Sequence, residues 1–238
     1  MNGLVGIGAT LCLLLAAGGL IGLIDRRRFA PRWLLVAALL VLVNDVLLTR
    51  AYGTVPNLLP ALDRNWQGKL LALLATLAVA ALPAFGWRRV GMTLAQAPGS
   101  LKAALPVLLL YCGFFAALAL AFPGAPESRE EILFQLTMPG LEEELFYRGI
   151  LLFALDRAFA GRWRFLGVDW GWGAALSSML FGLTHAFGYA DAGFGFDPLY
   201  MALTALPSLI AVWLRLRTGS LLLPVLVHNF GNSISMWI

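Results

Sequence analysis

The chain has 238 residues, of which 60% are hydrophobic and only 13% are charged, with a mean hydropathy of +0.81. A soluble domain would carry about 25% charged residues, so this composition excludes an ordinary soluble protein and indicates one domain embedded in a membrane. The net charge of +4 does not indicate nucleic-acid binding, because most basic residues fall in short loops and form no patch interleaved with aromatic residues.

Eight apolar segments follow one another along the chain, and each approaches the length of a membrane-spanning helix. They cover residues 4–24, 33–48, 70–87, 105–122, 132–155, 165–189, 198–214 and 220–238. The second and seventh are short, and the sixth carries glycines and Asp169 near its start, so seven spans plus an interfacial helix is the alternative. We therefore predict an all-α polytopic membrane protein with about eight transmembrane helices.

The basic residues between these segments predict the orientation. No basic residue precedes the first segment and several follow it directly, the reverse of a cleavable signal peptide, so we expect this span to be retained. Twelve basic residues fall on one side: Arg26, Arg27, Arg28, Arg32, Arg88, Arg89, Lys102, Arg157, Arg162, Arg164, Arg215 and Arg217. Four fall on the other: Arg50, Arg64, Lys69 and Arg129. The positive-inside rule places both termini outside the cytoplasm. The compact chain, without an organelle-targeting signal, favours a bacterial plasma (inner) membrane.

Three consecutive glutamates, Glu142, Glu143 and Glu144, lie inside the fifth apolar segment. A charge near the bilayer centre costs about 2.5–3.5 kcal/mol on insertion scales, so such a cluster needs a partner or a water-filled cavity. On an α-helix Glu144 would pair with Arg148 four residues later, which leaves Glu143 as the acid free for chemistry. The alternative is that all three glutamates line an interfacial turn and contact water.

Both histidines of the chain also fall in apolar segments. A single histidine on such a helix is more often a packing residue, but His185 and His228 together, beside an intramembrane acid, favour a catalytic site. Asn232 follows His228 by one helical turn and shares its face, whereas Asn229 points elsewhere. Phe181 precedes His185 by four residues, where we expect it to pack.

The polar residues of three segments resemble the motifs of a known family. The segments are EELFYR at 143–148, FGLTH at 181–185 and HNFGN at 228–232. They match the motifs EExxxR, FxxxH and HxxxN of the CPBP family, also called the ABI family, which comprises CAAX prenyl endopeptidases and bacteriocin-processing or immunity proteins. The resemblance implies a CAAX-protease-like helical bundle, with residues 1–238 as one transmembrane domain, N-terminal helices of undefined role at 1–125 and a catalytic core at 126–238.

The same resemblance implies a glutamate-dependent intramembrane endopeptidase without a cofactor. Glu143 would activate water with the help of His185, and His228 with Asn232 would stabilise the oxyanion. The supporting residues would be Glu144 and Arg148. The partners would be a membrane-associated protein or peptide substrate and the lipid bilayer, with no nucleic acid and with the oligomeric state left open.

Three alternatives remain for the function. A zinc-dependent protease could use Glu143, His185 and His228, since one Glu and two His form a known catalytic zinc set, but the HExxH spacing is missing and three helices would have to converge. A proton-coupled transporter would predict inverted repeats, which the sequence does not show. A non-catalytic immunity or binding protein could keep the motifs for packing alone.

Two further features lie outside the motifs. Asp45, beside Asn44 in the second segment, is expected to anchor a helix contact, with cavity lining as the alternative. Cys12 and Cys112 lie in apolar segments without metal-like spacing, so we expect buried free thiols.

Overall fold

In the computed structural model, which describes residues 2–124, 127–190 and 193–238, helices dominate. The α-helices are α1 (Asn2–Ile24), α2 (Pro31–Leu48), α3 (Trp66–Ala81), α4 (Leu101–Ala121), α5 (Arg129–Pro139), α6 (Leu152–Ala158), α7 (Trp172–Ala186), α8 (Pro198–Thr218) and α9 (Leu222–Ser233). A π-helix (Gly140–Leu151) joins α5 to α6, and short 3-10 turns cover Arg26–Arg28 and Ile234–Met236. The expected boundary between residues 125 and 126 lies outside the described residues.

Among the described residues, four helices are long and apolar enough to cross a membrane: α1, α2, α4 and α8. The shorter apolar helix α3 has 16 residues. The fifth expected span is the continuous helical run from α5 through the π-helix to α6, which carries the charged motif. The prediction of an all-α membrane protein is therefore confirmed, although only part of the expected spans have full spanning length as single helices.

The sixth expected span is wrong at both ends, because two hairpins flank its helix. β1 (Trp163–Phe165) pairs antiparallel with β2 (Val168–Trp170), and β3 (Phe187–Ala190) pairs with β4 (Gly193–Phe196). The first hairpin turns at Leu166 and Gly167, whose φ angles of 49° and 76° are left-handed and end any helix. The helix α7 is thus confined to the middle of that segment.

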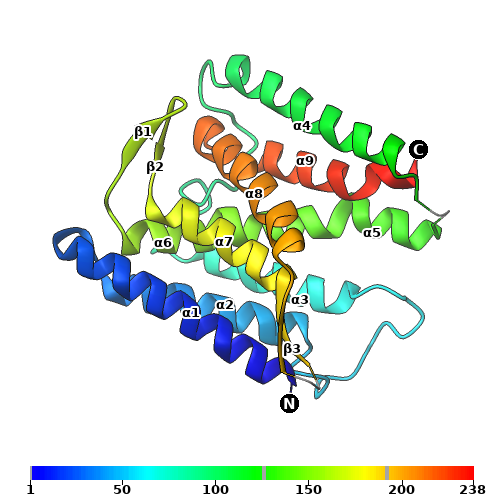
Figure 1. Cartoon of the computed structure of the whole chain (residues 1–238), viewed down its shortest axis with the longest axis horizontal. Coiled ribbons are helices and arrows are strands. Elements are labelled where there is room, and N and C mark those ends of the chain that lie inside the picture. Colours follow the sequence, from blue (N-terminus) through cyan, green and yellow to red (C-terminus); the bar gives the residue numbers. More distant parts are fainter. Residues whose placement is uncertain (1, 125–126, 191–192) are drawn as a thin grey trace.

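The motif-bearing helical run lies in the middle of the bundle (Figure 1). The α1–α2 hairpin and α3 pack on one side of the π-helix, and α9, with α4 beyond it, packs on the other. The helices α7 and α8 pack closely against each other, because Gly182 has no side chain: a Cβ there would lie 2.7 Å from Sδ of Met201. This arrangement brings side chains from both halves of the chain to the glutamates.

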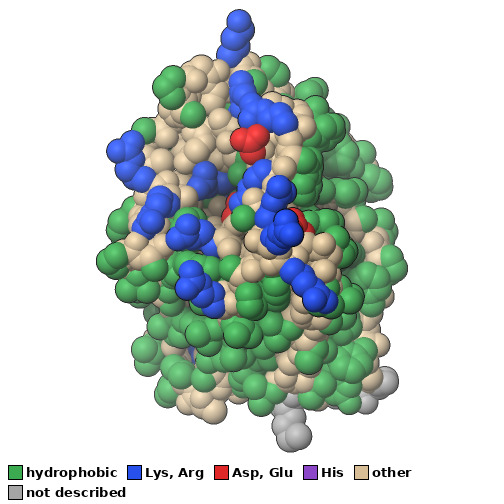
Figure 2. Space-filling model, turned by 90° about the vertical axis from the view of Figure 1, so that its left-hand side faces the viewer, with side chains coloured by type: hydrophobic (Ala, Val, Ile, Leu, Met, Phe, Trp, Pro, Cys, Tyr) green, Lys and Arg blue, Asp and Glu red, His purple; other side chains and the backbone are tan. Residues whose placement is uncertain are grey.

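The basic side chains gather over one end of the molecule (Figure 2). In Figure 1 this is the end with the α1–α2 loop and the β1–β2 hairpin, whereas both chain termini lie toward the other end. The segregation of charge between alternate loops is therefore present in three dimensions. Which end faces the cytoplasm stays a prediction.

The two cysteines are free, as expected, but they are not buried. Cys12 is exposed on α1 and Cys112 is half-buried on α4. Both helices lie at the outside of the bundle, so apolar sequence here reflects a surface that faces lipid rather than a protein core.

Candidate active site

The first motif lies in a π-helix, not in an α-helix. A π-helix bonds residue i to i+5 and has more residues per turn, so the 100° step used to assign faces from the sequence is wrong between Gly140 and Leu151. At its start, the backbone N–H of Gly140 donates to Oδ1 of Asn229 at 2.7 Å. A Cβ at Gly140 would lie 2.4 Å from that oxygen, so glycine lets α9 approach and cap the π-helix.

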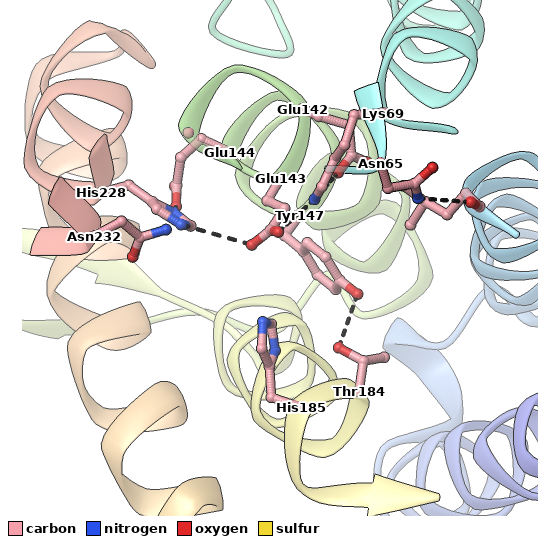
Figure 3. Close-up of polar contacts among 12 residues, drawn as sticks. Asn65, Lys69, Glu142, Glu143, Glu144, Tyr147, Thr184, His185, His228 and Asn232 are labelled. Carbon is pink, nitrogen blue, oxygen red and sulfur yellow. Dashed lines mark hydrogen bonds and ion pairs between the residues drawn. The ribbon is translucent and has the colours of Figure 1, made fainter. Parts of the chain in front are cut away.

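Lys69 is the direct partner of the motif's first glutamate. Its Nζ lies 2.5 Å from Oε1 of Glu143 and 2.7 Å from Oε2 of Glu142 (Figure 3). Glu142 is fully buried and Glu143 nearly so, at 13% side-chain exposure. Glu143 is therefore not the unpaired acid that α-helical geometry suggested, because one ammonium group compensates two carboxylates.

The segment before α3 is fastened to α5, and this fixes the place of Lys69. The Glu130 carboxylate accepts hydrogen bonds from the backbone N–H groups of Arg64 and Asp63 and from the Trp66 indole, all at 3.0 Å. The Arg64 and Asp63 donors hold the pKa of Glu130 below its ordinary value. Lys69 follows one turn later, so α3 enters the bundle at a set height beside the π-helix.

Glu144 forms the ion pair predicted from the sequence and also binds a histidine. Its Oε1 lies 3.2 Å from Nη1 of Arg148 and 2.6 Å from Nδ1 of His228. The other ring nitrogen of His228, Nε2, lies 3.6 Å from Oε2 of Glu143. The His228 imidazole thus stands between two acids (Figure 3), and the Arg148 guanidinium stacks over the Phe181 ring at 4.2 Å.

His185 is oriented by its own helix. Its Nδ1 lies 2.7 Å from the carbonyl oxygen of Phe181, and the two rings pack with centroids 4.6 Å apart. Nε2 is then the nitrogen left for the cavity, toward which His185 points from α7 (Figure 3). Beside it, the hydroxyls of Thr184 and Tyr147 lie 3.1 Å apart, which ties α7 to the π-helix.

Asn232 is held by a chain of polar side chains from α5. Its Nδ2 donates to Oε1 of Gln135 at 3.2 Å, and Gln135 in turn donates to Oε1 of Glu131 at 2.9 Å. Glu131 is itself paired with Arg64. The Asn232 amide is thus oriented from outside its own helix, and its expected oxyanion role stays a prediction.

A cavity of about 300 Å³ brings the motif residues together. The polar side chains that line it include Glu143, Glu144, Arg148, His185, His228 and Asn232, together with Lys69. An apolar groove of about 590 Å³ runs between α4 and α8 beside this cavity. The two share four lining residues: Tyr111, Phe115, Leu203 and Pro207. The polar site is therefore continuous with a surface that suits an apolar chain.

Residues 128–234 match a family model described as type II CAAX prenyl endopeptidase Rce1-like. This part of the chain is an Rce1-like domain. It spans α5 to α9 and contains all three motifs, so the suspected CAAX-protease family is confirmed, and the domain supports an intramembrane endopeptidase in general terms. No curated protein and no solved structure is detectably similar to the chain.

The sequence did not identify several residues that lie at the site of the Rce1-like domain. Lys69 was counted only as a loop cation, although a charged residue at the start of an apolar helix is itself a signal. Tyr147, Thr184 and Gln135 gave no signal, because their partners lie on other helices. Asn232 lines the main cavity, whereas Asn229 forms hydrogen bonds with Gly140 and Thr137 at the start of the π-helix.

The described residues of the Rce1-like domain and of the N-terminal helices contain no cluster of metal-binding side chains. Across residues 2–124, 127–190 and 193–238, no three His, Cys, Asp or Glu side chains are grouped so that they could hold a metal ion. The cation in contact with Glu143 is the Lys69 ammonium. Whether activity depends on zinc stays open to test by chelation.

Proposed function

We propose that the chain is a glutamate-dependent intramembrane endopeptidase that hydrolyses a peptide bond of a membrane-associated protein or peptide. The observation that carries the proposal is the placement of Glu143, whose carboxylate lies at a polar cavity inside the bundle with Lys69 on one oxygen and His228 beside the other. An acid so placed can take a proton from water at a peptide carbonyl.

The reaction needs one base and donors for the oxyanion. Glu143 accepts a proton from water, and the water oxygen attacks the carbonyl carbon as the C=O electrons move onto oxygen. The carboxylic acid then passes its proton to the leaving amide nitrogen as the C–N bond breaks. His185 positions the water through Nε2, because its Nδ1 is engaged with the backbone.

His228 and Asn232 are the proposed oxyanion donors. For His228 this role requires a proton on both ring nitrogens, because Nδ1 binds Glu144 while Nε2 faces the cavity beside Glu143. Asn232 uses one amide proton for Gln135 and retains the second for the oxyanion. Glu144 and Arg148 support the site by fixing the imidazole, as a carboxylate commonly does for a functional histidine.

The apolar groove supports a substrate that is anchored in the membrane. An apolar chain lying between α4 and α8 would deliver an attached peptide to the polar cavity through the shared wall. A peptide with an apolar anchor should therefore be cleaved with a higher kcat/KM than the same peptide without it. Equal values would contradict this part of the proposal.

Lys69 also favours the metal-free mechanism over the zinc alternative. Its ammonium group supplies, beside Glu143, the positive charge that a bound metal ion would otherwise supply. We therefore expect activity to survive chelation.

The decisive experiment is cleavage of a membrane peptide library, with products mapped by mass spectrometry. Purified wild type is compared with Glu143→Gln and His228→Ala, each with and without a chelator. Products that vanish in both variants and survive chelation support the glutamate mechanism. Products lost on chelation restore the zinc alternative, and products retained by Glu143→Gln contradict the role of this acid.

A further inference from the structure

A second cavity, of about 210 Å³, reaches the same carboxylate from the opposite side of the bundle. The main cavity is bounded mainly by α4, α5, α8 and α9 and the second by α1 and α2, while α3, α7 and the π-helix contribute side chains to both. Both cavities are lined by Lys69, Glu143 and His185. These three side chains therefore form a partition with space on either side.

Eight of the twelve residues that line the second cavity carry a polar side chain, although most of its lining surface is apolar. It contains Asn44, Asp45, Lys69, Glu142, Glu143, Tyr147, Thr184 and His185, beside the apolar Ile7, Val41, Leu48 and Phe146. The fully buried Glu142 carboxylate is held by Lys69 on Oε2 and has the Asn44 side chain against it. Its Oε1 forms no hydrogen bond of standard geometry within the described part of the chain. Buried polar groups in a space of this size are the setting in which proteins bind water.

Asp45 lies at this cavity and is not a simple helix anchor. It is half-buried and accepts a hydrogen bond from the Tyr52 hydroxyl, just beyond the end of α2. The expectation of cavity lining, which the sequence left as the alternative for Asp45, describes its position. The polar lining thus extends from the end of α2 inward to Glu143.

Hydrolysis inside a membrane requires that water reaches the catalytic acid. A peptide in the main cavity, with its apolar anchor in the α4–α8 groove, would cover Glu143 on that side. The second cavity remains in contact with the carboxylate from the α1–α2–α3 side. Water and peptide would then meet at Glu143 from opposite directions.

We propose that the second cavity is a water site that supplies the nucleophile to Glu143 while the peptide occupies the main cavity. This inference rests on the proposed endopeptidase function. It assigns a catalytic purpose to helices α1 to α3, which lie outside the Rce1-like domain.

Val41→Phe tests the proposal by filling the cavity without removing a polar group. Val41 lines the cavity and is buried, whereas Val43, on the same helix, is exposed, so Val43→Phe is the matched control. We expect Val41→Phe to lower kcat about tenfold with KM and the shape of the pH profile unchanged, since only the barrier to water attack rises. Asn44→Leu, which removes polar lining at similar volume, should act in the same direction if Val41→Phe fails to fold.

Radiolytic hydroxyl labelling detects side chains that are in contact with water, and it does not depend on peptidase activity. Tyr147 should be labelled in wild type and lose label in Val41→Phe, while Tyr111 in the main cavity keeps its label. An unlabelled Tyr147 in wild type, or a folded Val41→Phe with wild-type kcat, overturns the inference. If Tyr147 is labelled but wild type cleaves no peptide, the water site is supported and the proposed endopeptidase function is what fails.

Discussion

The Lys69 ammonium lies 2.5 Å from Oε1 of Glu143, although 74 positions separate the two residues in the chain. The cation comes from α3, outside the Rce1-like domain that carries the acid. The N-terminal helices therefore complete the electrostatic setting of the site. Each side chain is nearly buried, so removing Lys69 would leave two buried carboxylates without their shared counter-ion, whereas removing Glu143 would leave Lys69 paired with Glu142.

Removing this cation should alter the pH dependence of the reaction. In Lys69→Met, Glu142 and Glu143 would be left side by side without their shared partner, and two adjacent carboxylates tend to share a proton. We expect activity at neutral pH to fall and the acidic limb of the pH–rate profile to move to higher pH. Lys69→Arg, which keeps the charge, should retain the wild-type limb. The exposed Lys102→Met is the surface control, and an unmoved limb in Lys69→Met would argue against electrostatic coupling.

The three glutamates should differ in their effect on catalysis. Glu143→Gln removes the proposed base and should lower kcat by about 10²–10⁴-fold, the usual contribution of acid–base catalysis. Glu142→Gln keeps an oxygen for Lys69 and leaves Glu143 intact, so it should retain most of the activity. Steady-state cleavage of an identified peptide by both variants makes the comparison. If the two variants lose activity equally, the assignment of the base to Glu143 is wrong.

The buried Arg148 should matter for stability far more than a surface arginine. Its pair with Glu144 is 1% exposed on both sides, and breaking a buried pair costs about 3–5 kcal/mol. Arg164 forms a pair of similar length with Asp169, but both side chains are 63% exposed, and such pairs contribute roughly 0–1 kcal/mol. Thermal unfolding in detergent should show a large drop in Tm for Arg148→Ala and almost none for Arg164→Ala. Similar shifts for both would contradict the burial of the Glu144–Arg148 pair.

Gly140 should not tolerate even one added methyl group. The Cβ of Gly140→Ala would collide with Asn229 and with the carbonyl oxygen of Val225, and α9 would have to move together with His228. We expect losses of both Tm and kcat. Gly113→Ala, inside α4 with open space around it, should be neutral or stabilising by about 0.5–1 kcal/mol.

The orientation can be tested by labelling single cysteines. In a background with Cys12 and Cys112 replaced, Arg27→Cys lies in the basic loop after α1 and Val55→Cys in the loop before α3. If both termini are extracytoplasmic, an impermeant maleimide on intact cells should label Val55→Cys only, and Arg27→Cys only after the membrane is opened. The reverse pattern would invert the proposed topology.

Hydropathy and motif spacing anticipated the helices and most of the site, for reasons that are local. Apolar runs identify helices because each must bury its own backbone in lipid. Hydropathy did not predict the β1–β2 hairpin, because Trp163, Phe165 and Trp170 are as apolar as the start of a helix. Only the left-handed backbone at Leu166 and Gly167 distinguishes the hairpin from a helix. The Glu144–Arg148 pair was foreseen because four residues separate its members.

What the sequence could not predict depends on contacts between distant segments. The π-helix is favoured by the Asn229 side chain at Gly140, 89 positions away, and no periodicity within residues 140–151 announces it. The pairing of Lys69 with two glutamates likewise requires α3 to lie beside the π-helix. The family motifs identified the residues that line the main cavity. They did not extend to α3, which supplies Lys69.

The ion pairs around Glu143 join helices that are synthesised at different times. Three carboxylates share the two cations Lys69 and Arg148, and the His228 imidazole lies between Glu143 and Glu144. Lys69 is synthesised before any of the acids and lies in the first turn of α3, from which a long side chain can reach back to the membrane surface. The helix that carries the counter-ion is therefore synthesised before the helix that carries the three acids.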